Sequence, residues 1–144
     1  MASPLSMTRA EREQFLADAH VAVLAVERPD GPPLISPVWY GYEPGGDVRI
    51  STSDETVKAG LLRAAGRASL CAQRESLPYA YVTVEGPVAF GEITQEERLQ
   101  LAVRYLGEEM GRGYVETTAD VDNRLVTLTP QRWRTTDYAK MPPT

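Results

Sequence analysis

Two stretches of this chain decide its fold: Ile50-Ser51-Thr52-Ser53-Asp54-Glu55-Thr56-Val57-Lys58 and Tyr79-Ala80-Tyr81-Val82-Thr83-Val84-Glu85-Gly86. The first is typical of a strand that ends near Thr52 and turns into a helix, for which Ser53 or Asp54 is the expected N-cap. The second alternates side chains as a long strand does, so that Ala80, Val82 and Val84 share one face.

The turn from strand to helix is a candidate anion-binding site. Free backbone N–H groups at the start of a helix point to where the strand stops, and they carry the positive end of the helix dipole. Lys58 lies in the first turns of this helix and is one of only two lysines in a chain with thirteen arginines. The alternative is a solvated lysine on a helix surface, because most helix N-termini are simply capped.

Positive charge is concentrated around this turn. Residues 49–74 contain five basic and two acidic side chains, whereas the whole chain has 15 basic and 20 acidic residues and a net charge of -5. The segment is either a basic patch around the anion site or ordinary surface charge, depending on whether its side chains share a face. The acidic total argues against a general nucleic-acid binder.

Composition sets the outer limits. With 144 residues, 42% of them hydrophobic, we expect residues 1–144 to form one domain with its own core. No apolar run approaches the roughly 20 residues that span a bilayer, and the first residues do not resemble a signal peptide, so we expect a cytoplasmic protein that does not enter a membrane. Cys71 and His20 are each the single residue of their kind, which argues against a disulfide or a metal site.

Periodicity predicts six strands and three helices. The expected strands are residues 21–26, 34–42, 48–52, 68–73, 79–90 and 125–133, the last interrupted by Pro130. The expected helices run from Thr8 to Ala19, along Leu61, Leu62 and Ala65, and from Thr94 to Met110, with a polar loop over residues 111–123. Short strands joined by hairpins predict a mainly β (α+β) domain, a six-stranded antiparallel barrel with three peripheral helices.

Several motifs, taken in their order and spacing, resemble the pyridoxamine 5'-phosphate oxidase-like split β-barrel proteins, and more closely their flavin/deazaflavin oxidoreductase branch. They are Ser36-Pro37-Val38-Trp39-Tyr40, the run 52–58 followed by Ala68-Ser69-Leu70, the run 81–86, Arg104-Tyr105-Leu106-Gly107 and Pro130-Gln131-Arg132-Trp133. The resemblance implies a split barrel of the FMN-binding type. It also implies a homodimer with the cofactor between the subunits, its phosphate held by the strand end and by the lysine that Lys58 matches.

Two departures from the family pattern bear on the cofactor. Ser36 and Val57 stand where the pyridoxamine phosphate oxidases have arginines, and the C-terminal Arg-Leu-His-Asp-Arg sequence that serves their substrate is missing. Vitamin B6 oxidation is therefore not expected. The pattern looks more like the branch that uses the deazaflavin coenzyme F420, with FMN as the alternative.

The implied activity is hydride transfer from reduced coenzyme F420 to an activated double bond of a small molecule. Because the cofactor supplies the redox chemistry, the protein needs mainly to orient it and exclude water, and we assign no catalytic side chain. The expected cofactor contacts are Ser36, Pro37, Val38, Trp39, Ser51, Thr52, Ser53 and Lys58, with Tyr81 and Trp133 as weaker candidates from the partner subunit. Both rings can instead stabilise the barrel or the dimer interface. A non-enzymatic carrier of flavin, haem or another tetrapyrrole is the alternative class of function.

Overall fold

A computed structural model describes residues 3–18 and 20–143 of the chain as seven strands and four α-helices with a short 3-10 helix. The strands are β1 (Ala22–Arg28), β2 (Gly31–Val38), β3 (Val48–Ser53), β4 (Arg67–Arg74), β5 (Ala80–Glu92), β6 (Asn123–Leu128) and β7 (Arg132–Asp137). The helices are α1 (Arg9–Ala17), α2 (Val57–Ala65), α3 (Gln95–Leu106), α4 (Glu108–Thr117) and η1 (Tyr138–Lys140).

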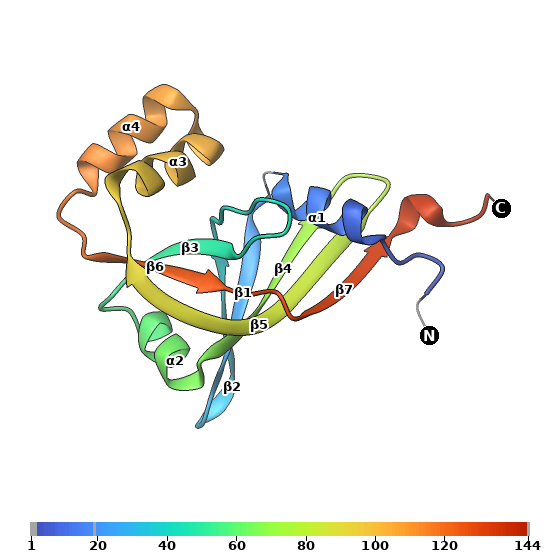
Figure 1. Cartoon of the computed structure of the whole chain (residues 1–144), viewed down its shortest axis with the longest axis horizontal. Coiled ribbons are helices and arrows are strands. Elements are labelled where there is room, and N and C mark those ends of the chain that lie inside the picture. The colour runs from blue at the N-terminus through green and yellow to red at the C-terminus, as the bar shows by residue number, and fades with distance from the viewer. Residues whose placement is uncertain (1–2, 19, 144) are drawn as a thin grey trace.

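All the strands belong to one antiparallel sheet in the order β2-β1-β4-β5-β6-β3, with β7 also paired to β5. The long strand β5 organises this sheet, because its first half pairs with β4 and β7 and its second half pairs with β6. Figure 1 shows β5 curving across the whole molecule, with α3 and α4 at one end and η1 at the other. The fold is an antiparallel, α+β sheet with flanking helices, as the sequence predicted.

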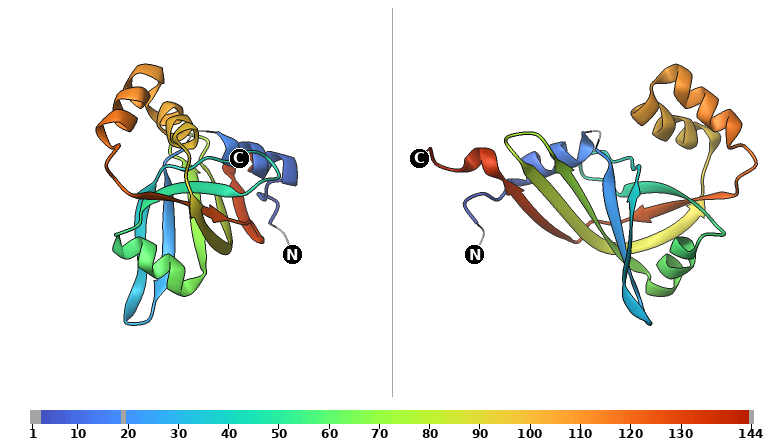
Figure 2. Two further views of the ribbon diagram at one scale, coloured as in Figure 1. Left: turned by 60° about the vertical axis from the view of Figure 1, so that its left-hand side comes forward. Right: turned by 180° about the vertical axis from the view of Figure 1, so that it is seen from behind.

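The core is formed by one face of the strands together with side chains of the helices. Alternate residues of β1, β4 and β5 point into it, among them Leu24, Leu70 and Val84, and each is at most 2% exposed. Leu16 of α1 and Leu62 of α2 complete the core from the helices. Figure 2 shows α2 and the α3–α4 pair at different ends of the sheet, so the helices cover separate parts of it.

The predicted sixth strand is wrong in its extent, since residues 125–133 contain the end of β6 and the start of β7. The break lies between Leu128 and Arg132, around Pro130, which has no N–H to donate to the sheet. Gly86 of β5 faces this break, and a Cβ at position 86 would collide with the carbonyl oxygen of Thr129. The close backbone approach therefore requires glycine at position 86.

Three other expectations about the elements are corrected. The predicted polar loop at residues 111–123 is largely α4, which also contains Met110, so there are four α-helices and not three. The second strand ends at Val38, and Gly41 makes only an isolated bridge to Arg49. The first helix ends at Ala17, and Ala19, the predicted last residue of that helix, lies outside the described residues.

Candidate functional site

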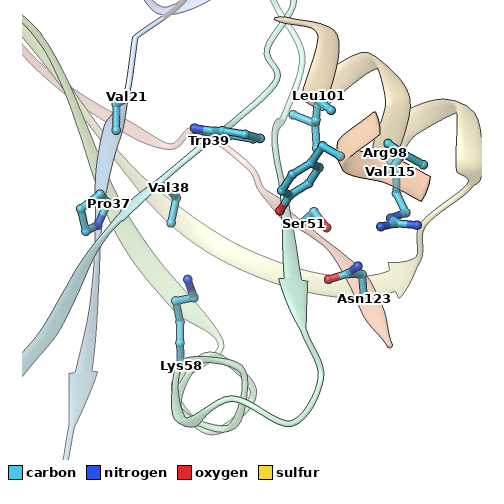
Figure 3. Close-up of a pocket in the computed structure, with 12 residues that line it drawn as sticks. Val21, Pro37, Val38, Trp39, Ser51, Lys58, Arg98, Leu101, Val115 and Asn123 are labelled. Carbon is cyan, nitrogen blue, oxygen red and sulfur yellow. The ribbon is translucent and has the colours of Figure 1, made fainter. Parts of the chain in front are cut away.

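A cavity of about 360 Å³ lies between the sheet and the α3–α4 pair, and we call it the cleft. Its walls come from the end of β2 and the residue after it, from β3 and α2, and from the helices on the opposite side (Figure 3). The lining residues are Val21, Pro37, Val38, Trp39, Ser51, Lys58, Arg98, Leu101, Ala102, Tyr114, Val115 and Asn123. The volume is within the range of small-molecule and cofactor sites.

Helix α2 directs Lys58 into the cleft. The helix begins after Thr56, whose side chain accepts a hydrogen bond from the N–H of Ala59 at 3.1 Å and donates one to the carbonyl of Ser53 at 2.9 Å. Thr56 is therefore the N-cap, and the predicted caps Ser53 and Asp54 are wrong. Ala59 and Leu62 are fully buried, which fixes the rotation of α2 against the core.

Lys58 carries an uncompensated positive charge. Burial lowers the pKa of its ammonium group below the ordinary value of 10.5, because the cleft wall removes part of its water. Among residues 3–18 and 20–143, no carboxylate forms an ion pair with it. An anion in the cleft would replace the missing water and supply the missing charge partner.

Three of the other four basic residues around the turn, Arg63, Arg67 and Arg74, form ion pairs with carboxylates, and none of the four lines the cleft with Lys58. Asp54 forms ion pairs with Arg63 and with Arg124, the second at 3.7 Å. Arg67 pairs with Glu27. Of the five basic residues at positions 49–74, only Lys58 lines the cleft. The interpretation as ordinary surface charge therefore applies to the other four.

Aromatic rings join the cleft to the helical pair. The indole of Trp39 stacks on Tyr105 with ring centroids 5.1 Å apart and lies 5.4 Å from the ring of Tyr114. The hydroxyl of Tyr105 donates to the carbonyl of His20 at 2.7 Å and accepts from the N–H of Tyr40 at 3.1 Å. These contacts hold Trp39 flat at the edge of the cleft, where it offers an apolar surface to a planar ring.

The structure brings five of the ten predicted cofactor contacts to one cavity: Pro37, Val38, Trp39, Ser51 and Lys58. Three more are their neighbours in sequence but do not line it: Ser36, Thr52 and Ser53. Thr52 is buried, and the hydroxyl oxygen of Ser36 is buried with no hydrogen-bond partner among the described residues. The role of these eight side chains toward a cofactor stays a prediction.

Tyr81 and Trp133 lie outside the cleft of their own chain. Tyr81 is 38% exposed on the outer side of β5, opposite Thr136 of β7. Trp133 of β7 is half-buried opposite Val84 of β5, and the guanidinium of Arg12 lies over its ring at 4.7 Å from the centroid. Neither residue lines the cleft of its own subunit, so their predicted role as contacts from a partner subunit stays a prediction.

Sequence reasoning missed the helical wall of the cleft. Arg98, Leu101 and Ala102 come from α3, and Tyr114 and Val115 from α4. Gly111 and Gly113 reduced the helix signal of α4, because glycine is a poor helix former. A detectable signal was present, since Gly111 and Val115 are four residues apart and form the buried face of this helix.

The chemistry of the cleft follows from its lining. Its two charged side chains, Lys58 and Arg98, are both cationic, and the remaining residues are apolar, aromatic or neutral polar. Within the described part of the chain, no group of His, Cys, Asp and Glu residues could hold a metal ion. No described helix is long and apolar enough to cross a membrane. The site is suited to a partly apolar, anionic small molecule.

The family model of pyridoxamine 5'-phosphate oxidase matches residues 8–137 of this chain. The chain therefore belongs to the pyridoxamine 5'-phosphate oxidase family, as the motifs around Ser36, Lys58 and Tyr81 indicated. A comparison with curated proteins gives no match.

Solved structures share the fold. The conserved hypothetical protein Rv2991 from Mycobacterium tuberculosis has a TM-score of 0.82 at 22% identity, over 100% of this chain and 94% of its own. An F420 reductase has a TM-score of 0.69 at 21% identity, over 85% of this chain and 94% of its own. A heme binding protein from Mycobacterium smegmatis has a TM-score of 0.63 at 22% identity, over 94% of this chain and 60% of its own.

Proposed function

We propose that this protein is an oxidoreductase that binds reduced deazaflavin coenzyme F420 in the cleft and uses it to reduce an activated double bond of a small organic molecule. The observation that carries the proposal is the half-buried ammonium group of Lys58, which lies without a carboxylate partner among the described residues in a cleft of suitable size. The family membership and the shared fold with an F420 reductase support it.

The residues of the cleft fit such a cofactor. Lys58 would hold the phosphate as a charge-assisted hydrogen-bond donor, and the hydroxyl of Ser51 lies on the neighbouring wall (Figure 3). Pro37, Val38 and Trp39 would pack against the ring and exclude water from it. The cofactor, when bound, supplies the hydride, and the protein supplies its position.

The proposed preference for F420 over FMN rests on the residues at two positions, 36 and 57, where the pyridoxamine phosphate oxidases have arginines. Ser36 and Val57 replace the two arginines of the pyridoxamine phosphate oxidases, and Val57 is 72% exposed, so an arginine in its place would have room. With these cations absent, the phosphate of FMN would lose two of its usual partners. The binding of a coenzyme that has other anchoring groups would depend less on these two cations.

We also propose that the protein acts as a homodimer, because the cleft borders an exposed sheet face. Pro37 of β2, Val23 of β1, Cys71 of β4 and Thr83 of β5 form one row across the strands. Val23 is 42% exposed, and Ile35, which shares the outer side of β2, is 63% exposed. A second copy on this face would bury the row and, through Pro37, close the side of the cleft.

In such a dimer, Tyr81 and Trp133 of one subunit are the residues we expect near the cofactor of the other. A stable interface should bury more than about 1,000 Å². Light scattering at micromolar concentration, with the coenzyme bound, should give the mass of two chains. A monomer under these conditions would contradict the dimer and leave the cleft open to water.

A second candidate function is a non-enzymatic carrier of haem or another tetrapyrrole. It is favoured by the fold shared with a heme binding protein and by the planar surface that Trp39 offers at the cleft. Haem carries carboxylates that the two cations of the cleft could also hold.

The test is to titrate purified protein separately with F420, FMN, FAD and haem, and to follow each binding by fluorescence or absorbance. Preferential binding of F420, followed by oxidation of the reduced coenzyme when enones are supplied, supports the oxidoreductase. Binding of a cofactor without reduction of enones or of a tetrapyrrole supports the carrier function. Tight FMN binding with weak F420 binding would refute the choice of coenzyme.

A further inference from the structure

The position of Arg98 in the cleft is explained neither by the family motifs nor by the proposed cofactor phosphate site. Arg98 lies on α3, across the cleft from α2 and Lys58 (Figure 3). It is half-buried, and within the described residues it makes no ion pair. A protein with five more acidic than basic residues thus keeps two unneutralised cations on opposite walls of one small cavity.

The side chain of Arg98 is held in place by its own chain. One terminal nitrogen, Nη1, donates to the side-chain oxygen of Gln95 at 3.0 Å. The other, Nη2, donates to the carbonyl and the hydroxyl oxygen of Thr118 at 3.1 and 2.7 Å. All three acceptors are uncharged, and a guanidinium has five N–H donors, so donors and the full positive charge remain for a ligand.

The placement of Arg98 on α3 also needs an explanation. It lies near the first turn of the helix, where the dipole is unfavourable to a positive charge. Its contact with Thr118, the C-cap residue of α4, offsets this cost and ties the two helices together. The result is a fixed guanidinium at the cleft wall, and a fixed guanidinium suits the planar geometry of a carboxylate.

We infer that Arg98 forms a second anion subsite of the cleft, which binds a carboxylate of the bound ligand while Lys58 holds a separate phosphate. The inference rests on the proposed function only for the assignment of the phosphate to Lys58. The carboxylate belongs either to the side chain of the coenzyme or to the substrate that it reduces. In both cases, the cleft binds two anionic groups, a phosphate at Lys58 and a carboxylate at Arg98.

The test compares Arg98→Gln with Arg112→Gln, a matched control. Arg112 lies on α4 in the same helical pair, is exposed, and does not line the cleft, so its replacement removes the same charge without touching the site. Arg98→Lys is a second variant, which keeps the charge and removes the planar guanidinium. It keeps the test informative where loss of the Thr118 contacts unfolds the glutamine variant.

The first measurement needs no coenzyme. Nitrogen-15-labelled protein is titrated with glutarate, a simple dicarboxylate, and the Nε–H signal of Arg98 is assigned by its loss in Arg98→Gln. We expect this signal to shift to saturation in the wild type and in Arg112→Gln. An unmoved signal at saturating glutarate would overturn the inference, whatever coenzyme the protein uses.

The second measurement locates the carboxylate. If it belongs to the coenzyme, the affinity of Arg98→Gln for F420 falls about tenfold or more, while its affinity for FMN, which has no carboxylate, stays unchanged. If it belongs to the substrate, coenzyme affinity is unchanged and KM rises about tenfold for a carboxylated enone, but not for its methyl ester. Arg98→Lys should give an intermediate loss in either case.

The failures are distinguishable. Unchanged coenzyme affinity together with unchanged KM in Arg98→Gln overturns the second subsite and leaves the proposed function standing. Absence of F420 binding by the wild type refutes the proposed function, and the glutarate titration then decides the subsite by itself.

Discussion

Replacing Lys58 by methionine tests the phosphate site most directly. Methionine keeps the length and the apolar stem of the side chain and removes the ammonium group that reaches the cleft. A charge-assisted hydrogen bond to phosphate contributes roughly 1.5–3 kcal/mol, so the Kd for the coenzyme should rise about 10- to 100-fold. Fluorescence titration of the coenzyme with each protein measures this change.

The same substitution should not destabilise the empty protein. Burial disfavours the charged form of Lys58, and none of the described carboxylates compensates it, so the free energy of unfolding should stay equal or increase slightly in Lys58→Met. Arg63→Gln is the matched control on α2, because its guanidinium pairs with Asp54, lies 4.2 Å from the ring of Phe90 and does not line the cleft. We expect that control to lose some stability and to keep its coenzyme affinity.

Two results would refute this reasoning. An unchanged Kd in Lys58→Met would show that Lys58 does not bind the phosphate and would favour the alternative of a solvated lysine on the helix surface. An equal loss of affinity for a deazaflavin fragment that lacks the phosphate would show that Lys58 acts on another part of the ligand.

Three further expectations concern the cofactor, the pH dependence and the helical wall. Ser36→Arg combined with Val57→Arg should narrow the preference for F420 over FMN, and a folded double variant whose FMN affinity does not rise would place these positions away from the phosphate. Because the pKa of Lys58 is lower in the folded than in the unfolded chain, the unfolded state binds more protons just below 10.5. The unfolding free energy of the wild type should therefore rise relative to Lys58→Met as the pH rises through that window, as pH-dependent chemical denaturation would measure. Gly111→Ala should cost about 1–3 kcal/mol of stability, because a Cβ there would meet Val103 at 2.9 Å, whereas Gly113→Ala, with nothing within 4 Å, should be neutral or stabilising. Equal denaturation midpoints for the two alanine variants would contradict that packing argument.

Local patterns predicted the parts of the fold that depend on local chemistry. The capping box at Thr8 and Glu11 and the one at Thr94 and Glu97 both open helices, with the reciprocal hydrogen bonds that such boxes make. The buried face of β5 is the predicted set of Ala80, Val82 and Val84. Alternation and capping are properties of neighbouring residues, so one sequence is enough to show them.

Contacts between distant residues were not predictable in this way. The break between β6 and β7 depends on the approach of Thr129 to Gly86, which are far apart in sequence. Helix α4 is stabilised where Gly111 lies against Val103 of α3, so the residue that weakens the helix signal is the one that its packing requires. Half of the predicted cofactor contacts line the cleft, and Arg98 was missed because its position there follows from the helical pair as a whole.

The α3–α4 pair begins and ends at adjacent points of the sheet, since Glu92 at the end of β5 pairs with Arg124 near the start of β6. The intervening segment thus connects two neighbouring antiparallel strands, which pair in register from Val88 with Leu128 to Glu92 with Arg124. Evolution can lengthen, shorten or exchange such a connection while the barrel keeps its topology. Proteins that share this sheet can therefore diverge in ligand choice faster than in architecture, and the sequence of the connection is the place to compare when relatives are sorted by substrate.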